Sequence, residues 1–104
     1  MNSIKYDIKI YRPIGYVDKF GNTYPINYGY IPGIIAGDGE EQDVYVLDID
    51  YSVDRTSKPI IAIIKRKNDI ENKWVAADKR YTKEEIWDHV KFLEQHFDIE
   101  IEVL

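Results

Sequence analysis

The residues best suited to chemistry lie in the acidic segment 38–43, which places four carboxylates within six positions. From residue 20 to residue 54 the chain has seven acidic residues and no Lys or Arg. Carboxylates gathered without local cations repel one another, and a hard divalent ion such as Mg²⁺ offsets this repulsion because it prefers oxygen ligands. Asp38, Glu40 and Asp43 are therefore candidate metal ligands. The alternative is a solvated acidic loop, which is the usual state of a charge run.

Tyrosines crowd the segment that precedes these acids. Tyr24, Tyr28 and Tyr30 lie there, among nine tyrosines in the whole chain. A phenol beside a metal site can donate a hydrogen bond to a phosphate oxygen. The alternative is that these rings pack in the core with their hydroxyls satisfied. We expect core packing for Tyr24 and Tyr30, and either role for Tyr28.

Groups that could hold a phosphate occur at two other places. The mixed-charge segment 65–73 contains Asp69, Glu71 and Lys73. If the fold returns this segment to the first acidic loop, the two acids would add metal ligands and Lys73 would hold a phosphate as a point charge. Otherwise the segment is a charged hairpin tip. Arg12 falls on the apolar face of an alternating segment, so its guanidinium is expected to point inward and to need an anionic partner.

Composition limits the other classes of site. With 104 residues, the chain is long enough for one compact domain, which we place at residues 1–104. A net charge of −5 argues against binding nucleic acid or an anionic membrane through bulk charge. The lack of Cys excludes disulfides and thiolate sites, and His89 and His96 show no zinc-ligand pattern. The sequence contains no apolar run of membrane-spanning length and no signal peptide, so a cytoplasmic protein is expected.

Alternating and β-branched patterns predict the strands that must position these residues. Residues 4–12 alternate between apolar and polar side chains, as a half-buried strand does, and residues 59–64 form an apolar run suited to a strand buried on both faces. Lys65 and Arg66 are expected to end that run, and residues 50–58 are expected to form a polar loop. The expected strands comprise residues 4–12, 24–31, 43–49, 59–64, 74–77 and 99–103.

One amphipathic helix is predicted near the C-terminus. Thr82 and Glu85 have the Thr-x-x-Glu spacing of a capping box, which starts a helix. Spacings of four, three and four residues then mark an apolar stripe, formed by Ile86, Val90, Leu93 and Phe97. Many short strands, Gly and Pro turns and one late helix predict a mainly β (α+β) fold, in which a small β-barrel packs against this helix.

Three segments together resemble a known family. The run Tyr24-Pro-Ile-Asn-Tyr-Gly-Tyr-Ile-Pro32, followed by Asp38-Gly-Glu-x-x-Asp43, is similar to the signature of the family I (soluble, metal-dependent) inorganic pyrophosphatases. Ile10-Tyr-Arg12 resembles the strand that presents the family's phosphate-binding arginine, and Asp69-x-Glu71-x-Lys73 resembles its second acidic cluster and the lysine that follows. The length of the chain is similar to that of a shortened bacterial subgroup.

The resemblance implies an OB-like five-stranded β-barrel with a flanking helix. It implies hydrolysis of inorganic pyrophosphate to two phosphates with two or more Mg²⁺ ions, for which Mn²⁺ can substitute. Homo-oligomers are common in the family. The residue roles that it implies are metal binding by Asp38, Asp43, Glu71 and Asp69, activation of water by Glu40, and binding of phosphate oxygens by Arg12, Tyr28 and Lys73.

The sequence also departs from the family pattern. Glu40 and Glu71 stand where the family has Asp, and the family's Tyr-Lys pair near the C-terminus has no counterpart around His96 and Phe97. Fewer phosphate contacts predict a slower enzyme or one that acts on another phosphoanhydride. A second hypothesis is a pyrophosphatase-like module that binds a nucleotide or phosphorylated ligand without efficient turnover. A third is an OB-like scaffold for a protein or single-stranded nucleic acid, which is disfavoured because the aromatic residues lie in the acidic half of the chain.

Overall fold

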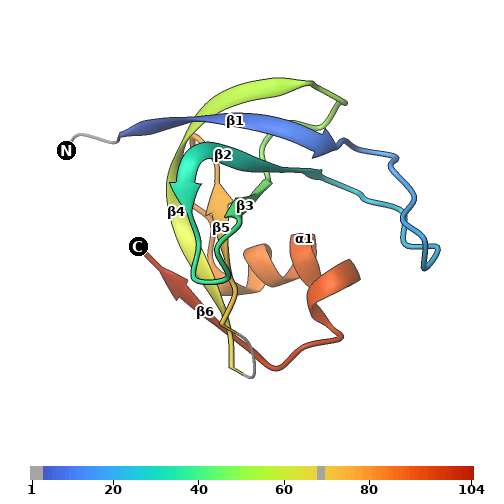
Figure 1. The fold of residues 1–104 in the computed structure, drawn as a ribbon. Helices are drawn as coiled ribbons and strands as arrows, with labels where there is room; N and C mark the ends of the chain where they lie inside the picture. Colours follow the sequence, from blue (N-terminus) through green and yellow to red (C-terminus); the bar gives the residue numbers. More distant parts are fainter. Residues whose placement is uncertain (1–3, 68–69) are drawn as a thin grey trace.

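Six strands and one helix are present in the computed structural model over the residues that it describes, 4–67 and 70–104 (Figure 1). In chain order the elements are β1 (Lys5–Arg12), β2 (Asn27–Ile35), β3 (Glu41–Val46), β4 (Arg55–Arg66), β5 (Asn72–Ala76), α1 (Lys83–Glu94) and β6 (Ile99–Val103). The one helix among the described residues is not long and apolar enough to cross a lipid bilayer.

The strands form a closed barrel with one extra strand. The hydrogen-bonded order is β1-β2-β3-β5-β4, and β4 pairs again with β1 to close the ring of five strands. β6 pairs with β4 outside this ring. β3 and β5 run parallel, whereas the other pairs are antiparallel. The predicted mainly β (α+β) fold, an OB-like five-stranded barrel with one C-terminal helix, is confirmed.

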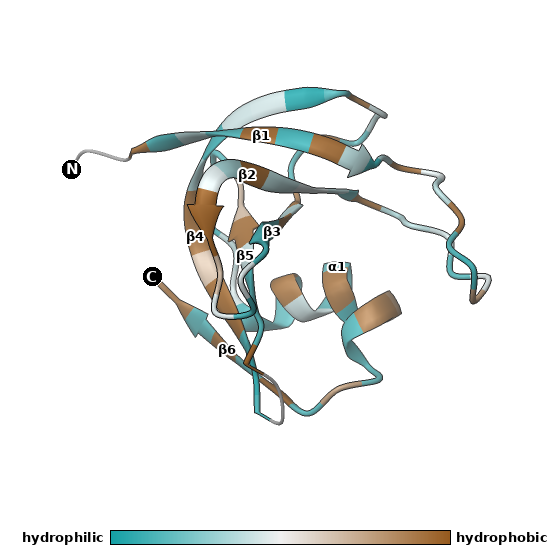
Figure 2. Ribbon diagram, in the orientation of Figure 1, coloured by the Kyte–Doolittle hydropathy of each residue, from teal (hydrophilic) through white to brown (hydrophobic). Residues whose placement is uncertain are grey.

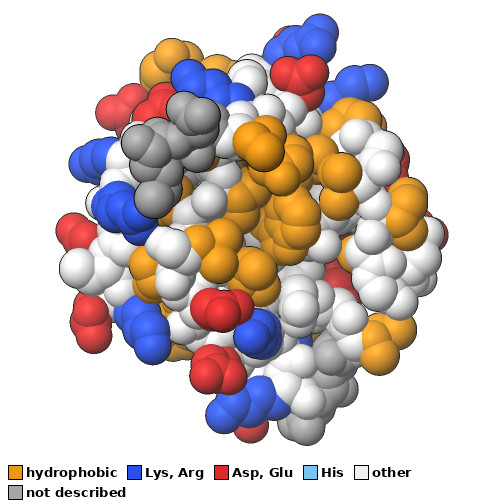
Figure 3. Space-filling model, turned by 90° about the vertical axis from the view of Figure 1, so that its left-hand side faces the viewer, with side chains coloured by type: hydrophobic (Ala, Val, Ile, Leu, Met, Phe, Trp, Pro, Cys, Tyr) orange, Lys and Arg blue, Asp and Glu red, His pale blue; other side chains and the backbone are white. Residues whose placement is uncertain are grey.

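Alternate residues of β3 pack into two different hydrophobic clusters. Val44 and Val46 join one cluster, while Tyr45 joins another that includes Ile86 and Val90 of α1. This alternation is the period of two that a strand imposes on its side chains. α1 therefore covers one face of the curved sheet (Figure 1), and hydrophobic residues lie along β4 and on α1 (Figure 2). Hydrophobic side chains also gather in a surface patch on the side of the barrel that Figure 3 shows.

The strand β4 is longer than its sequence predicts. Residues 55–58, expected to belong to a polar loop, pair with β1, with Arg55 opposite Lys9 and Lys58 opposite Tyr6. Lys65 and Arg66, expected to end the strand, pair with β6 instead. Both expectations are wrong because a polar segment can be a strand when partners on neighbouring strands satisfy its backbone groups.

The bounds of β2, β3 and β5 also differ from expectation, and the strand expected at residues 74–77 lies at Asn72–Ala76. β2 continues beyond Pro32 to Ile35, and the pairing with β3 shifts register between Ile31 and Ile35. Such an irregularity lets a strand accommodate Pro and Gly. The strand expected at residues 43–49 lies at Glu41–Val46. These shifts move the ends of the predicted strands without changing their order in the chain.

The predicted capping box starts α1. The Glu85 backbone N–H donates to Thr82 Oγ1 (3.1 Å), and the Thr82 backbone N–H donates to Glu85 Oε1 (2.8 Å). Ile86 and Val90 of the predicted stripe are fully buried. Phe97 lies beyond the helix, which ends at Glu94. Its ring instead covers the guanidinium of Arg66, with the guanidinium carbon 3.7 Å from the ring centroid.

Candidate active site

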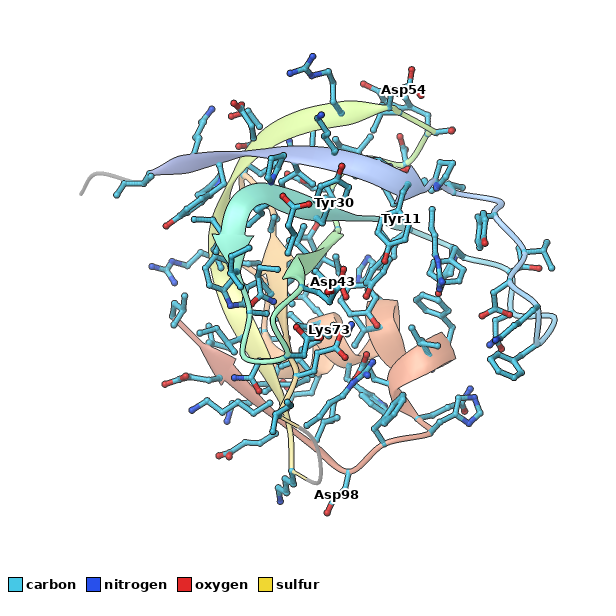
Figure 4. All side chains as sticks on the ribbon, in the orientation of Figure 1. Tyr11, Tyr30, Asp43, Asp54, Lys73 and Asp98 are labelled. Atoms are coloured by element: carbon cyan, nitrogen blue, oxygen red, sulfur yellow. The ribbon has the colours of Figure 1, made fainter. Side chains whose placement is uncertain are left out.

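The barrel brings the second charged segment to the first. The parallel pairing of β3 with β5 places Lys73 beside Asp43, and Lys73 Nζ lies 2.7 Å from Asp43 Oδ2. Lys73 Nζ also pairs with the Glu71 carboxylate. The lysine residue is only 4% exposed, and Figure 4 shows Asp43 and Lys73 next to each other. Asp69, the remaining predicted ligand of this segment, lies outside the described residues.

The ion pair keeps Asp43 ionised. Burial raises the pKa of Asp43, but its hydrogen bond with the Lys73 ammonium and the attraction of that charge outweigh burial, so the pKa lies below its ordinary value. Lys73 Nζ also lies 5.5 Å from the centre of the Tyr28 ring. The buried ammonium therefore lies among two carboxylates and one aromatic face.

Two tyrosines next to Asp43 remain protonated donors. The Tyr11 hydroxyl donates to Asp43 Oδ1 at 3.3 Å. Burial, followed by the Asp43 charge, raises the pKa of Tyr11 to about 12. The same two causes raise the pKa of Tyr28 well above its ordinary value. Tyr28 is 3% exposed, as core packing would require, but its neighbours include the charged groups of the site.

Tyr11 was not expected at the site from its sequence. Alternation along residues 4–12 assigns it to the face opposite Arg12, yet the pairing of β1 with β2 shifts register between Ile10 and Arg12. The ring of Tyr11 contacts the rings of Tyr28 and Tyr30, with centroids 5.7 and 5.9 Å apart. A bulge that redirects one side chain leaves little signal in the sequence.

The predicted acids line one open pocket of about 420 Å³, formed by Tyr11, Tyr30, Asp38, Glu40, Glu41 and Asp43. Asp38 and Glu40 are exposed, and Asp38 Oδ1 accepts a hydrogen bond from the Glu40 backbone N–H (3.0 Å). Glu41, which the sequence reasoning omitted, accepts from the Gly33 backbone N–H through Oε2 (3.0 Å). The three predicted carboxylates at 38, 40 and 43 thus share a pocket, whereas Glu71 meets Asp43 through Lys73.

Arg12 is held by tyrosines and not by a carboxylate. Its Nη1 donates to the Tyr24 hydroxyl at 2.5 Å, and the rings of Tyr11, Tyr16, Tyr24 and Tyr28 lie 5.4–6.0 Å from its guanidinium carbon. Within residues 4–67 and 70–104 it forms no ion pair, so the expected anionic partner is replaced by aromatic faces. The guanidinium keeps a positive charge that can receive an anion.

The donor set of the pocket suits a hard cation, because it consists of carboxylate oxygens. In the described part of the chain, no three acidic or histidine side chains converge closely enough to hold a metal ion. Lys73 instead joins Asp43 to Glu71. The carboxylate oxygens of Asp38, Glu40 and Asp43 thus fit Mg²⁺ by their chemistry, whereas their arrangement is not that of a formed metal site.

Part of the sequence matches curated inorganic pyrophosphatases. The chain is 43% identical over 47 residues to the protein of Ralstonia nicotianae, an alignment that covers 42% of this chain and 27% of that protein. It is 43% identical over 49 residues to the inorganic pyrophosphatase of Aeropyrum pernix, covering 44% and 28%. The matched part thus spans only about a quarter of the length of these relatives. No family model matches the chain.

The fold is similar to solved inorganic pyrophosphatases over nearly the whole chain. The structure from Ehrlichia chaffeensis has a TM-score of 0.71 and 16% identity, covering 99% of this chain and 88% of that one. The structure from Helicobacter pylori has a TM-score of 0.68 and 15% identity, covering 99% and 84%. The chain is thus similar to inorganic pyrophosphatases in its fold and in one shared segment of sequence, in agreement with the resemblance of its Tyr24–Asp43 motif.

Proposed function

We propose that this chain hydrolyses inorganic pyrophosphate to two phosphates with the aid of Mg²⁺. The observation that carries the proposal is the buried ion pair of Lys73 with Asp43 and Glu71, next to a pocket lined by carboxylates. The names of the matched relatives support the same substrate. Action in the cytoplasm and assembly as a homo-oligomer stay predictions, as does a single domain at residues 1–104.

Each site residue has a role in this proposal. Asp38, Asp43 and Glu71 would hold the metal, and Asp69 stays a predicted fourth ligand. When bound, Mg²⁺ would lower the pKa of a coordinated water and neutralise phosphate charge. Glu40 accepts a proton from the attacking water. The roles on the substrate side are charge stabilisation by Arg12 and Lys73 and hydrogen-bond donation by Tyr28, whose raised pKa keeps it protonated.

The test is phosphate release from pyrophosphate with and without Mg²⁺, in the wild type and in Asp43→Ala. We expect the wild type to release phosphate only with Mg²⁺, and the variant to be slower by roughly 10²- to 10³-fold, as when one group that stabilises a transition state is removed. In Asp43→Asn the thermal shift caused by Mg²⁺ should also disappear, because the carboxylate charge provides the binding energy. A ligand at a hundred times its Kd stabilises by about 2.7 kcal/mol, so the shift in the wild type is measurable.

A matched control is Asp54→Asn, which removes another exposed acid of the same acidic region. Figure 4 shows Asp54 beyond β1, away from Asp43. This variant should keep both the activity and the Mg²⁺-induced shift. Mg²⁺-dependent binding of pyrophosphate without phosphate release would favour the binding-module hypothesis instead. A thermal shift that survives intact in Asp43→Asn would contradict the metal site.

A further inference from the structure

A buried cluster of three polar side chains, Arg66, Glu94 and Tyr45, has no role in the proposed chemistry and lies beside the candidate active site. Arg66, the last residue of β4, donates to Glu94 Oε1 from Nε (3.0 Å) and to Glu94 Oε2 from Nη2 (2.7 Å). The Tyr45 hydroxyl donates to the same Glu94 Oε2 at 2.5 Å. Arg66 is 8% exposed, while Tyr45 and Glu94 are fully buried. Three elements, β3, β4 and α1, therefore meet at one carboxylate.

Fold stability alone is a weak reason for this arrangement. Two charges taken out of water lose hydration, and replacing such a pair by apolar side chains of similar volume is often neutral or stabilising. The helix already packs through buried apolar residues, Ile86 and Val90 among them. What the pair adds over an apolar contact is direction, because a bidentate guanidinium–carboxylate pair fixes the relative orientation of two elements.

Two of the three residues, Tyr45 and Arg66, are linked to residues of the site. Tyr45 lies directly opposite Tyr28 in the pairing of β2 with β3, and the two ring centroids are 4.9 Å apart. The pairing of β4 with β5 places Lys65 opposite Asn72, so Arg66 and Glu71 each adjoin a paired residue at the same end of these two strands. Burial lowers the pKa of Arg66, but Glu94 and, more weakly, Glu71 outweigh it and raise the pKa above its ordinary value. The group thus reaches Tyr28 by packing and Glu71 by charge.

We propose that Arg66, Glu94 and Tyr45 are positioning residues, which anchor Tyr28 and the Glu71 end of β5 to helix α1. The inference rests on the proposed function, because it concerns the same site. Tyr45 acts on the donor that faces phosphate, and Arg66 acts on a carboxylate that holds metal. Loss of the Tyr45 hydroxyl should therefore affect kcat, and loss of the Arg66–Glu94 pair should also affect metal affinity.

The main test is the double variant Arg66→Met with Glu94→Leu, which removes both charges and keeps much of the volume. Its melting temperature should fall only modestly, because both charges leave together and the remaining cost is that of the buried Tyr45 hydroxyl, which loses its acceptor. Mn²⁺ affinity, measured by titration, and kcat for pyrophosphate should each fall roughly tenfold, as when a group that orients a metal ligand is removed. Tyr45→Phe removes only a hydroxyl, and it should lower kcat by about tenfold while leaving Mn²⁺ affinity unchanged.

The control is Lys65→Met with Glu102→Leu, an exposed ion pair (3.1 Å) on the adjacent residue of β4. It should change neither kcat nor Mn²⁺ affinity. The proposal is overturned if the folded double variant binds Mn²⁺ and turns over pyrophosphate as the wild type does. If the double variant does not fold, Tyr45→Phe decides, and an unchanged kcat in that variant overturns the proposal.

The measurements also separate this inference from the proposed function. A wild type that binds Mn²⁺ but releases no phosphate contradicts pyrophosphate hydrolysis, and weaker Mn²⁺ binding by the double variant would still support the positioning role. Unchanged Mn²⁺ binding in that case overturns it. A wild type that neither binds Mn²⁺ nor releases phosphate overturns both, because there is then no metal site to position.

Discussion

Two lysines in this barrel are each held by two carboxylates, and their surroundings differ. The side chains of Lys73 and Lys58 are 6% and 11% exposed, so both ammonium groups are largely removed from water. Their partners are Asp43 and Glu71 for Lys73, and Asp48 (3.4 Å) and Asp78 (2.5 Å) for Lys58. The same charge pattern thus occurs twice, once beside the acid-lined pocket and once elsewhere.

The difference lies in what the carboxylates bind besides lysine. Asp48 Oδ2 accepts the backbone N–H of Asp78 at 2.7 Å, so this cluster ties the turn after β3 to the turn after β5. Asp43 Oδ1 receives a side-chain hydroxyl, that of Tyr11, and Asp43 lines the pocket. Asp48 is thus held by the backbone of another turn, whereas Asp43 is bonded to side chains that it can exchange for a ligand. The comparison teaches that the Lys58 cluster supports the fold and the Lys73 cluster is suited to binding.

The largest expected effect is that of Lys73→Met. Phosphate release should fall by about 10²-fold, because the variant loses the charge that is proposed to bind phosphate. Asp43 and Glu71 would then repel each other without a cation between them. The stabilisation produced by Mg²⁺, measured as a shift in melting temperature, should therefore be larger than in the wild type. An unchanged shift would mean that Mg²⁺ binds away from this pair.

The matched change in the other cluster, Lys58→Met, should act on stability instead. It leaves Asp48, whose side chain is 12% exposed, without its cation. Removing one partner of a largely buried pair costs about 3 kcal/mol of unfolding free energy, which urea denaturation would measure. Mg²⁺ should not restore the loss, and kcat should stay at the wild-type value. A fall in kcat comparable to that of Lys73→Met would remove the distinction between the two clusters.

Local patterns in the sequence were sufficient for much of the fold. The alternation along residues 4–12 predicts β1, and the Thr82–Glu85 spacing predicts the start of α1, because each depends on residues within one turn or one strand. The start of β4 at Arg55 could not be predicted in this way, because its polar residues become a strand only through pairing with β1. The type of each element could thus be predicted from residues close together in the sequence, whereas its length depended on pairing with distant strands.

For the candidate site, too, the residue types could be predicted from the sequence, but their contact partners could not. Its residue types were evident, since Asp38, Glu40 and Asp43 lie close in sequence and line one pocket. The partners were not, because Asp43 and Lys73 are 30 positions apart and meet only through the parallel pairing of β3 with β5. Arg66 was expected to break a strand, yet its buried pair with Glu94 spans 28 positions. Contacts between distant strands depend on register, which a single sequence does not specify.

The smallest expected effect is the pH dependence of the Lys58 cluster. The hydrogen bond from Lys58 lowers the pKa of Asp78 below its ordinary value of 3.8. The carboxylate therefore adds stability above that pH and loses it as the pH falls through the lower pKa of the folded state. Unfolding free energies of the wild type and Asp78→Asn should differ by a constant amount near neutrality and converge in acid. Because the Asp78 side chain is 50% exposed, solvent screening should keep the difference below about 1 kcal/mol.

The pH dependence of the unfolding free energy can also be measured for Asp43→Asn, which changes a partner of Lys73. Asp43 also has a lowered pKa, so Asp43→Asn should likewise converge with the wild type in acid. Adding Mg²⁺ near neutral pH should widen the gap for Asp43→Asn, since only the wild type keeps the charged ligand, and should leave the gap for Asp78→Asn unchanged. If Mg²⁺ widened both gaps equally, the backbone hydrogen bond at Asp48 would not be what separates a supporting cluster from a binding one.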